Sequence, residues 1–170
     1  MAFQTRMIRG STKVLGLAST RILKPGKEFE GDFLRDAVAQ KSDNRYQYSL
    51  NPTRATYTRH GGRKIIGTFT CNNHKHPRIW YSGIICTELH LTSGGYYRTI
   101  LHSQQCRSCE AYVEPEVDKE NYVQKIVSAL DLWNGRPARQ EPTSYFNKTP
   151  PHDEKRCHAC QVGICSRASR

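Results

Sequence analysis

The chain has 170 residues, a formal net charge of +11 at pH 7 and a sequence pI near 9.5. Hydrophobic residues make up 36% of it and the mean hydropathy is -0.72, which leaves room for one ordinary domain with a modest core plus a tail. No apolar run reaches the roughly 18 residues of a transmembrane helix, and no apolar secretory signal opens the chain. The excess positive charge favours a polyanionic partner, either nucleic acid or an anionic membrane surface.

The first segment, residues 1–27, is basic and contains no acidic residue. Its Ser, Thr, Ala and Leu content resembles a mitochondrial presequence. However, Gly10, Gly16 and Pro25-Gly26 would interrupt the amphipathic helix of such a segment. A retained basic arm explains the charge equally well, so both interpretations stay open.

Residues 28–63 are predicted to form an extension made of a helix and a loop. Phe29, Phe33 and Ala37 recur at helical spacing, which predicts a short amphipathic helix over residues 28–40. Residues 41–62 are rich in polar residues and end in two glycines, so we expect a loop or irregular strand there.

Three strands are predicted next. Ile65, Ile66 and Phe69 indicate a strand over residues 64–70 that runs into Cys71, and residues 79–91 and 96–105 form two more around a turn at residues 93–95. The last strand ends on Cys106, so two cysteine turns meet at the base of one long hairpin. This is the arrangement of a zinc ribbon, in which one ion fixes the register of the strands.

A second helix and a loop complete the domain. Asp118 is its predicted N-cap, Tyr122, Ile126 and Leu130 lie on one face, and Gly135 ends it. We expect this face to pack against the hairpin. Residues 136–151 contain four prolines and form a loop that leads to His152.

Cysteine and histidine residues recur at spacings typical of zinc ligands. A two-residue gap lets both side chains of a tight turn bind one ion, and Zn²⁺ takes four sulfur and nitrogen ligands tetrahedrally. The candidate ligands are Cys71, His74 or His76, Cys106, Cys109, His152, Cys157, Cys160 and Cys165. In a chain with no secretory signal, these pairs favour metal over disulfides and predict a reducing, intracellular compartment.

Several neighbouring residues are expected to be structural. Cys86, the seventh cysteine, is predicted to be a small buried hydrophobe. Trp80 is predicted to be core. We expect His90 and His102 to be polar surface residues, and His158 to point away from an ion held by its neighbours.

Five stretches carry a family resemblance: residues 67–71, 80–82, 105–109, 122–135 and 151–165. In them the chain resembles the 3CxxC-type zinc-binding domain family over about residues 64–165, and its fungal members most of all. The vertebrate receptor-transporting proteins and the zygote arrest proteins belong to the same family. Where the family carries a cysteine, this chain offers His74 or His76; the family's spacing to the following tryptophan favours His76, and a plain two-residue gap favours His74.

These observations predict an α+β fold: a zinc-ribbon-like antiparallel hairpin or sheet with a packed helix, two structural zinc ions, and a short basic tail at residues 166–170. By chain proximity, one ion is held by Cys71, His76 or His74, Cys106 and Cys109, and the other by His152, Cys157, Cys160 and Cys165. Ligand sets that cross between these halves are the alternative.

No catalytic activity is expected, because four protein ligands close a zinc site to water. The pattern His152-Asp-Glu154 before Cys157 and Cys160 imitates a zinc deaminase signature. However, two residues between Glu154 and Cys157 are too few for the strand that separates the two deaminase motifs.

Two functions fit this chain. In the first, it binds nucleic acid, RNA in preference to DNA, with basic residues neutralising phosphates and tyrosines stacking on bases: Arg54, Arg59, Arg63, Lys64, Tyr81, Tyr96 and Tyr97. The resemblance to the zygote arrest proteins, which are taken to bind RNA, implies this function. In the second, it is a protein-interaction or trafficking adaptor, as the receptor-transporting proteins imply. We expect a cytoplasmic or nuclear location, or a mitochondrial one if residues 1–27 are a presequence.

Overall fold

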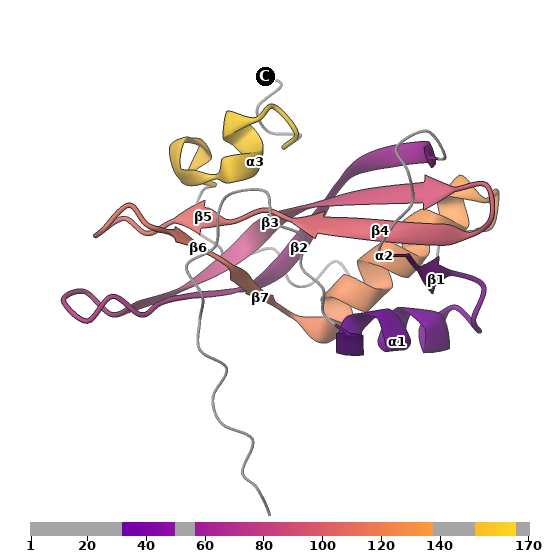
Figure 1. Ribbon diagram of the computed structural model, residues 1–170, viewed down its shortest axis with the longest axis horizontal. Helices are drawn as coiled ribbons and strands as arrows, with labels where there is room; N and C mark the ends of the chain where they lie inside the picture. Colours follow the sequence, from indigo (N-terminus) through magenta and orange to yellow (C-terminus); the bar gives the residue numbers. More distant parts are fainter. Residues whose placement is uncertain (1–31, 50–56, 138–151, 166–170) are drawn as a thin grey trace, which may run out of the picture.

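The computed structural model describes residues 32–49, 57–137 and 152–165 (Figure 1). The basic arm of residues 1–27, Arg54, the tail of residues 166–170 and most of the predicted proline-rich loop lie outside the described residues. Within the described part, no helix is long and apolar enough to cross a membrane.

A five-stranded sheet forms the centre of the domain, with the strand order β1-β4-β3-β2-β7. Its middle is an antiparallel meander of β2 (Tyr57–Cys71), β3 (Arg78–Thr92) and β4 (Tyr96–Leu101). At the two edges, β1 (Gln47–Tyr48) pairs in parallel with β4, and β7 (Pro115–Val117) pairs antiparallel with β2.

The other elements lie around this sheet. Helices α1 (Asp32–Lys41) and α2 (Lys119–Trp133) lie on one side, and the C-terminal segment with the 3-10 helix η3 (Glu154–Arg156) and helix α3 (His158–Gln161) lies on the other (Figure 1). β5 (Gln104–Gln105) and β6 (Tyr112–Val113) form a separate two-stranded ribbon.

Two adjacent glycines of β2 show that the sheet has two covered faces. A Cβ atom on Gly61 would lie 3.4 Å from the Trp133 ring of α2, whereas one on Gly62 would lie 3.5 Å from the carbonyl oxygen of Ile164. Successive residues of a strand point to opposite faces, so α2 and the C-terminal segment cover opposite faces of β2.

The main core lies between the sheet and the two long helices. Apolar side chains from all three layers are at most 3% exposed: Leu34, Val38, Ile65, Phe69, Ile85, Leu89, Tyr97, Ile126 and Leu130. Burying one such side chain contributes roughly 1.5–3 kcal/mol, so this face carries most of the apolar stabilisation of the fold.

The predicted second helix is confirmed, including its ends. The Asp118 carboxylate accepts a hydrogen bond from the Asn121 backbone N–H at 2.8 Å, and Gly135 ends the helix with φ of 71°. The side chain of Asn121 accepts from the backbone N–H of Ile66, whose carbonyl accepts from Asp118 N–H. Because the β2–β3 register shifts between Ile65 and Gly67, the start of α2 satisfies the backbone groups that this bulge leaves unpaired.

The α+β fold class is confirmed, and the structure defines two of the predicted segments further. The segment over residues 41–62, expected to be a loop or irregular strand, contains β1 and the first part of β2, where polar and glycine residues pair with β3 through the backbone. The expected strand over residues 96–105 is divided: β4 ends at Leu101, and β5 at Gln104–Gln105 pairs with β6 instead of β3. A polar strand with a paired backbone carries little of the hydrophobic alternation that identifies strands in a sequence.

Candidate metal centres

The C-terminal cluster contains the four ligands predicted for it. The ligand atoms of His152, Cys157, Cys160 and Cys165 all lie within 4.8 Å of one another. His152 Nε2 is 3.2 Å from Cys160 Sγ and 3.8 Å from Cys165 Sγ. Tetrahedral zinc with ordinary bond lengths places nitrogen and sulfur ligands about 3.5 Å apart, so this donor set fits zinc.

A compact turn brings these four residues together. The backbone N–H of Cys160 bonds to the carbonyl of Cys157, and those of Ile164 and Cys165 both bond to the carbonyl of Ala159. Gly163 reverses the chain with φ of 75°. The segment thus folds back on itself through local hydrogen bonds, which explains why its ligand spacing is readable in the sequence.

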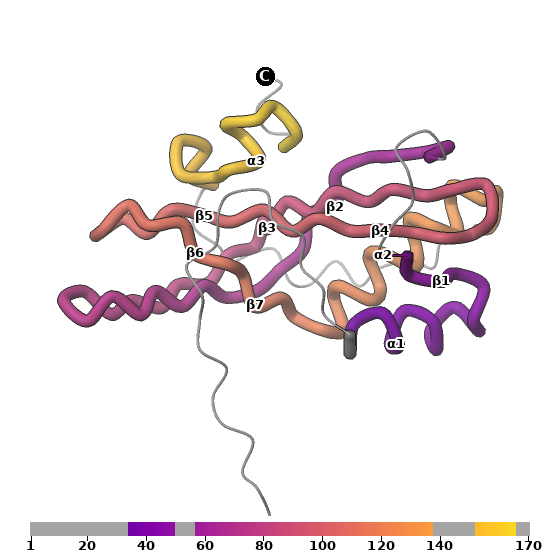
Figure 2. Tube along the Cα trace, in the orientation of Figure 1, coloured from indigo at the N-terminus to yellow at the C-terminus, as the bar shows by residue number. Residues whose placement is uncertain are grey.

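The second cluster lies where the hairpin turn after β2 and the loop between β5 and β6 reach the same end of the molecule (Figure 2). It contains Cys71, Cys106 and Cys109, with 3.6 Å between the sulfur atoms of Cys71 and Cys109. Two thiolates on one tetrahedral zinc lie about 3.7 Å apart, so these sulfurs also fit the ion. The loop is closed by hydrogen bonds from Glu110 N–H to the Cys106 carbonyl and from Cys106 N–H to the Ala111 carbonyl.

The predicted fourth ligand of this cluster is not gathered with the three cysteines. His74 and His76 lie in the exposed turn between β2 and β3, and neither belongs to the group of ligand atoms. Asn73 organises this turn, since its carbonyl accepts from His76 N–H and its side chain accepts from Lys75 N–H. The structure therefore groups the cysteines by chain proximity, and the choice between the two histidines stays a prediction.

Burial opposes ionisation of most of these thiols. It raises the pKa of Cys71, Cys157 and Cys160. Burial also acts on Cys106, but hydrogen bonds from the backbone N–H groups of Ser108 and Cys109 bring the pKa of its thiol below the ordinary value. A divalent cation would supply the charge that stabilises these buried thiolates, so metal binding and proton release are coupled here.

Cys86 is buried, as expected, but its position was not predictable. It is 4% exposed and packs with Cys157, Cys165 and Ala159 in a small second core. Burial, followed by the proximity of Cys165 and Cys157, raises the pKa of its thiol. Cys86 thus provides the contact between β3 and the C-terminal cluster as a neutral side chain.

The prediction that His102 lies on the surface is wrong. It is 3% exposed, its Nε2 lies 2.7 Å from Glu88 Oε1, and its Nδ1 lies 3.1 Å from Nδ1 of His158. His90 lies 3.3 Å from the other oxygen of Glu88. The hydrogen bond with His102, together with the nearby imidazole of His90, lowers the pKa of Glu88 to about 2. The C-terminal segment covers the end of β4, which no local pattern at His102 could indicate.

The residues predicted for nucleic-acid binding do not form one surface. Arg59 and Lys64 are exposed on β2, while the guanidinium of Arg63 lies 4.7 Å from the centre of the Trp133 ring. Tyr81 and Tyr96 are 45% and 47% exposed, but Tyr81 pairs with Thr68 near the cysteine end of the hairpin, and Tyr96 lies at the opposite turn.

Tyr97 cannot stack on a base. It is 1% exposed and packs edge-on against Tyr48 in the main core, so this part of the prediction is wrong. Tyr96 and Tyr97 are adjacent in β4 and point to opposite faces, and only the register of the sheet decides which of them is buried.

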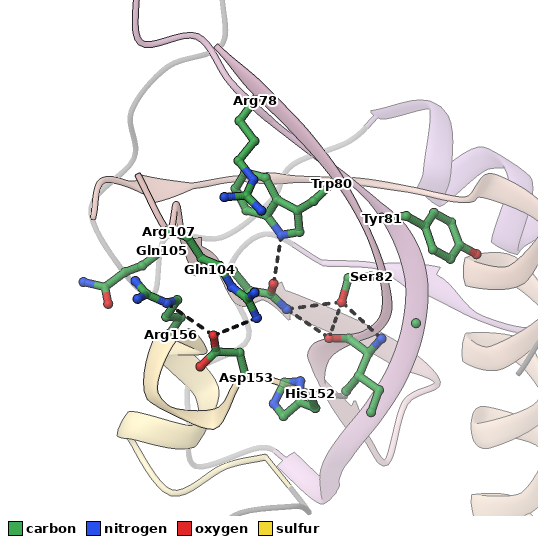
Figure 3. A pocket seen from close by; sticks show the side chains of 12 residues that line it. Arg78, Trp80, Tyr81, Ser82, Gln104, Gln105, Arg107, His152, Asp153 and Arg156 are labelled. Carbon is green, nitrogen blue, oxygen red and sulfur yellow. Dashed lines mark hydrogen bonds and ion pairs between the residues drawn. The ribbon is translucent and has the colours of Figure 1, made fainter. Parts of the chain in front are cut away.

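A polar pocket between the two clusters was not predicted. It has a volume of about 130 Å³, and side chains from the start of β3, the β5–β6 region and the C-terminal segment line it (Figure 3). Its charged residues are Arg78, Arg107, Asp153 and Arg156. Arg107 lies between the ligands Cys106 and Cys109. The spacing of these cysteines therefore identified this turn in the sequence, but it did not indicate a pocket beside the turn.

A family model described as a zinc-binding domain, of the zinc-ribbon 3CxxC type, matches residues 64–163, which is more than half of the chain. No curated protein and no solved structure matches the chain significantly. The matched segment contains every ligand of the two clusters except Cys165. The chain therefore belongs to the 3CxxC zinc-ribbon family of zinc-binding domains.

Proposed function

We propose that this zinc-binding domain is a structural module that binds single-stranded RNA through basic and aromatic surface residues. The observation that carries the proposal is the charge: the chain has a net charge of +11, and Arg59 and Lys64 are exposed on β2 with no acidic partner in the described part of the chain. Cations of this kind neutralise phosphates without reading a sequence. The exposed rings of Tyr81 and Tyr96 add the stacking surface that single-stranded nucleic acid uses.

In this proposal both zinc ions are structural. The C-terminal cluster offers four protein ligands, which fill a tetrahedral shell and leave no position for a reacting water. We propose that His76 or His74 completes the shell of the cysteine cluster. Zinc thiolates persist in reducing compartments, so we place the protein inside the cell, in the cytoplasm, the nucleus or, if residues 1–27 are a presequence, the mitochondrion.

The test is the affinity of the zinc-loaded full-length protein for a uridine homopolymer across a salt series. For single strands, the log-log slope flattens by about 0.7 for each phosphate contact that is lost. Arg59→Gln combined with Lys64→Gln should therefore flatten the slope by about 1.4, if each residue neutralises one phosphate.

The matched control is Lys41→Gln combined with Lys119→Gln, which removes the same charge from exposed positions on α1 and α2. An equal effect of both double variants would mean that only net charge matters, and an affinity that ignores salt would contradict the proposal.

A protein-interaction adaptor is the second candidate. Ile79 is 71% exposed and shares a face of β3 with Tyr81, so this end of the hairpin offers apolar surface. Salt-insensitive capture of one protein, lost in Ile79→Ser and retained in Val162→Ser at an exposed site on the C-terminal segment, would favour the adaptor over RNA binding.

A further inference from the structure

The pocket between the two metal clusters is built from parts of both. Arg107 lies inside the Cys106–Cys109 turn, whereas Asp153 and Arg156 lie between the ligands His152 and Cys157. Arg78 and Trp80, at the start of β3, form the third side (Figure 3). The pocket can therefore exist only when the two clusters hold their segments against β3.

The excess positive charge of the pocket favours an anionic ligand. Asp153 Oδ2 lies 3.2 Å from Arg107 Nη2 and 3.3 Å from Arg156 Nε, so two guanidinium groups share one carboxylate (Figure 3). Arg78 is exposed and has no acidic partner in the described part of the chain. Three guanidinium groups and one carboxylate thus line the pocket, and the N–H groups that Asp153 leaves free suit the paired oxygens of a phosphate.

The neutral wall of the pocket is fixed by its own hydrogen bonds. The Trp80 indole N–H donates to Gln104 Oε1 at 3.2 Å, and the Gln104 amide donates to the Ser82 hydroxyl at 3.3 Å and to the Ile84 carbonyl at 3.2 Å (Figure 3). Phe69 stacks on Trp80 with ring centres 5.1 Å apart. Such a wall needs no reorganisation when a ligand enters, which lowers the cost of binding.

The size of the pocket agrees with a small polar group. One water needs about 10–15 Å³ of such volume, and this pocket has about 130 Å³. Tyr81, although adjacent to Trp80, points away from the pocket (Figure 3). Aromatic stacking by Tyr81 and anion binding in the pocket are therefore separate contributions from neighbouring residues of β3.

We propose that this pocket binds one backbone phosphate of the single-stranded RNA, held by Arg78, Arg107 and Arg156. The inference rests on the proposed function and identifies the phosphate site within it. Because the walls belong to both metal clusters, loss of metal from either cluster separates the arginines and weakens RNA binding.

The test uses zinc-loaded full-length protein and a uridine homopolymer in a salt series. Arg78→Gln and Arg107→Gln should each weaken binding about tenfold, as expected for loss of a charge-assisted hydrogen bond, and the pair should flatten the salt slope by about 0.7 for the single phosphate that they share. Arg78→Lys should keep the slope but lose affinity, because lysine keeps the charge without the two-pronged geometry.

The matched control is Arg136→Gln, an exposed arginine that follows α2 and does not line the pocket. Zinc content and the circular dichroism spectrum should be unchanged in all of these variants, which shows that they fold. RNA binding by the wild type with no difference between the pocket variants and Arg136→Gln would overturn the pocket site and leave the proposed function intact.

If the wild type does not bind RNA, the proposed function fails. Binding of uridine monophosphate and of a phosphopeptide is then measured, to learn whether the pocket takes the phosphate of a nucleotide or that of a protein. Binding of the phosphopeptide that depends on Arg78 would assign the pocket to a protein partner and overturn the RNA inference.

Cys160→Ser tests the role of metal, since it removes a C-terminal ligand and keeps all three arginines. It should weaken RNA binding at least as much as Arg78→Gln, and binding at the wild-type level would contradict the coupling.

Discussion

Glu88 lies between two imidazole rings on the face of the sheet that the C-terminal segment covers. His102 and His90 lie 2.7 Å and 3.3 Å from its two oxygens. The hydrogen bond with His102 and the nearby His90 imidazole lower the pKa of Glu88 to about 2, compared with about 4.3 for an ordinary glutamate. A carboxylate with a lowered folded-state pKa stabilises the fold above its ordinary pKa and loses this effect as the pH falls towards the folded value.

We therefore expect Glu88→Gln to lower the free energy of unfolding by about 1.5–3 kcal/mol at pH 7, the range for a hydrogen bond to a charged group. Denaturant titration measures this difference, which should stay constant between pH 7 and 5 and shrink below about pH 4.3, where the wild-type carboxylate begins to gain its proton in the unfolded state. Glu116→Gln, at an exposed position on β7, is the control and should change little. A difference that grows towards low pH would contradict the assignment.

At the scale of single elements, Gly67 is where β2 meets both of its neighbours. A Cβ atom there would clash with the carbonyl oxygen of Glu116 on β7, and would lie 2.8 Å from Ile85 Cδ1 and 2.9 Å from Val117 Cα. The pairing of β7 with β2 at residues 67–69 leads the chain into α2. The absence of a side chain at this position thus allows the edge strand to approach.

Gly67→Ala is expected to cost about 1–3 kcal/mol of stability, because the backbone of β7 must shift to admit the methyl group. The midpoint of denaturant unfolding measures this, with the m-value unchanged if the fold is kept. Gly62→Ala on the same strand is the matched control, since its nearest contact would be an ordinary 3.5 Å. Equal midpoints for the two variants would show that the backbone of β7 can shift to admit the methyl group with no loss of stability.

At the scale of the whole molecule, the two candidate metal clusters lie in segments that the main core reaches to different extents. The main core contains Cys71 and Cys106 but no residue of the C-terminal cluster, which packs on β3 through Cys86 and a few neighbours. Structural zinc contributes roughly 10–16 kcal/mol in small domains, against a net folding stability of about 5–15 kcal/mol. The metal is therefore expected to decide whether these segments are ordered.

Protein purified without chelator should contain two zinc ions per chain, measured by elemental analysis, and a chelator should abolish cooperative unfolding. Cys160→Ser and Cys109→Ser should each lose one ion, because each removes a ligand from a different cluster. Cys86→Ser is the control and should keep both, since Cys86 belongs to neither ligand group. One zinc or fewer in the wild type would contradict the two-site arrangement.

The sequence by itself determined the features that depend on local spacing. The two-residue gaps place Cys157 with Cys160 and Cys106 with Cys109, and the N-cap at Asp118 sets the start of α2. These features are readable because a tight turn or a capped helix is specified by residues within a few positions of one another.

The tertiary structure alone decided which side chains meet across the sheet. The register of β4 buries Tyr97 and exposes Tyr96, and the C-terminal segment buries His102 and places Cys86 beside its ligands. Arg78, Arg107 and Arg156 likewise line one pocket only because the loop between β5 and β6 and the C-terminal segment both reach the start of β3. Such contacts depend on strand register and on which face the chain returns to, and neither is encoded in the spacing of neighbouring residues.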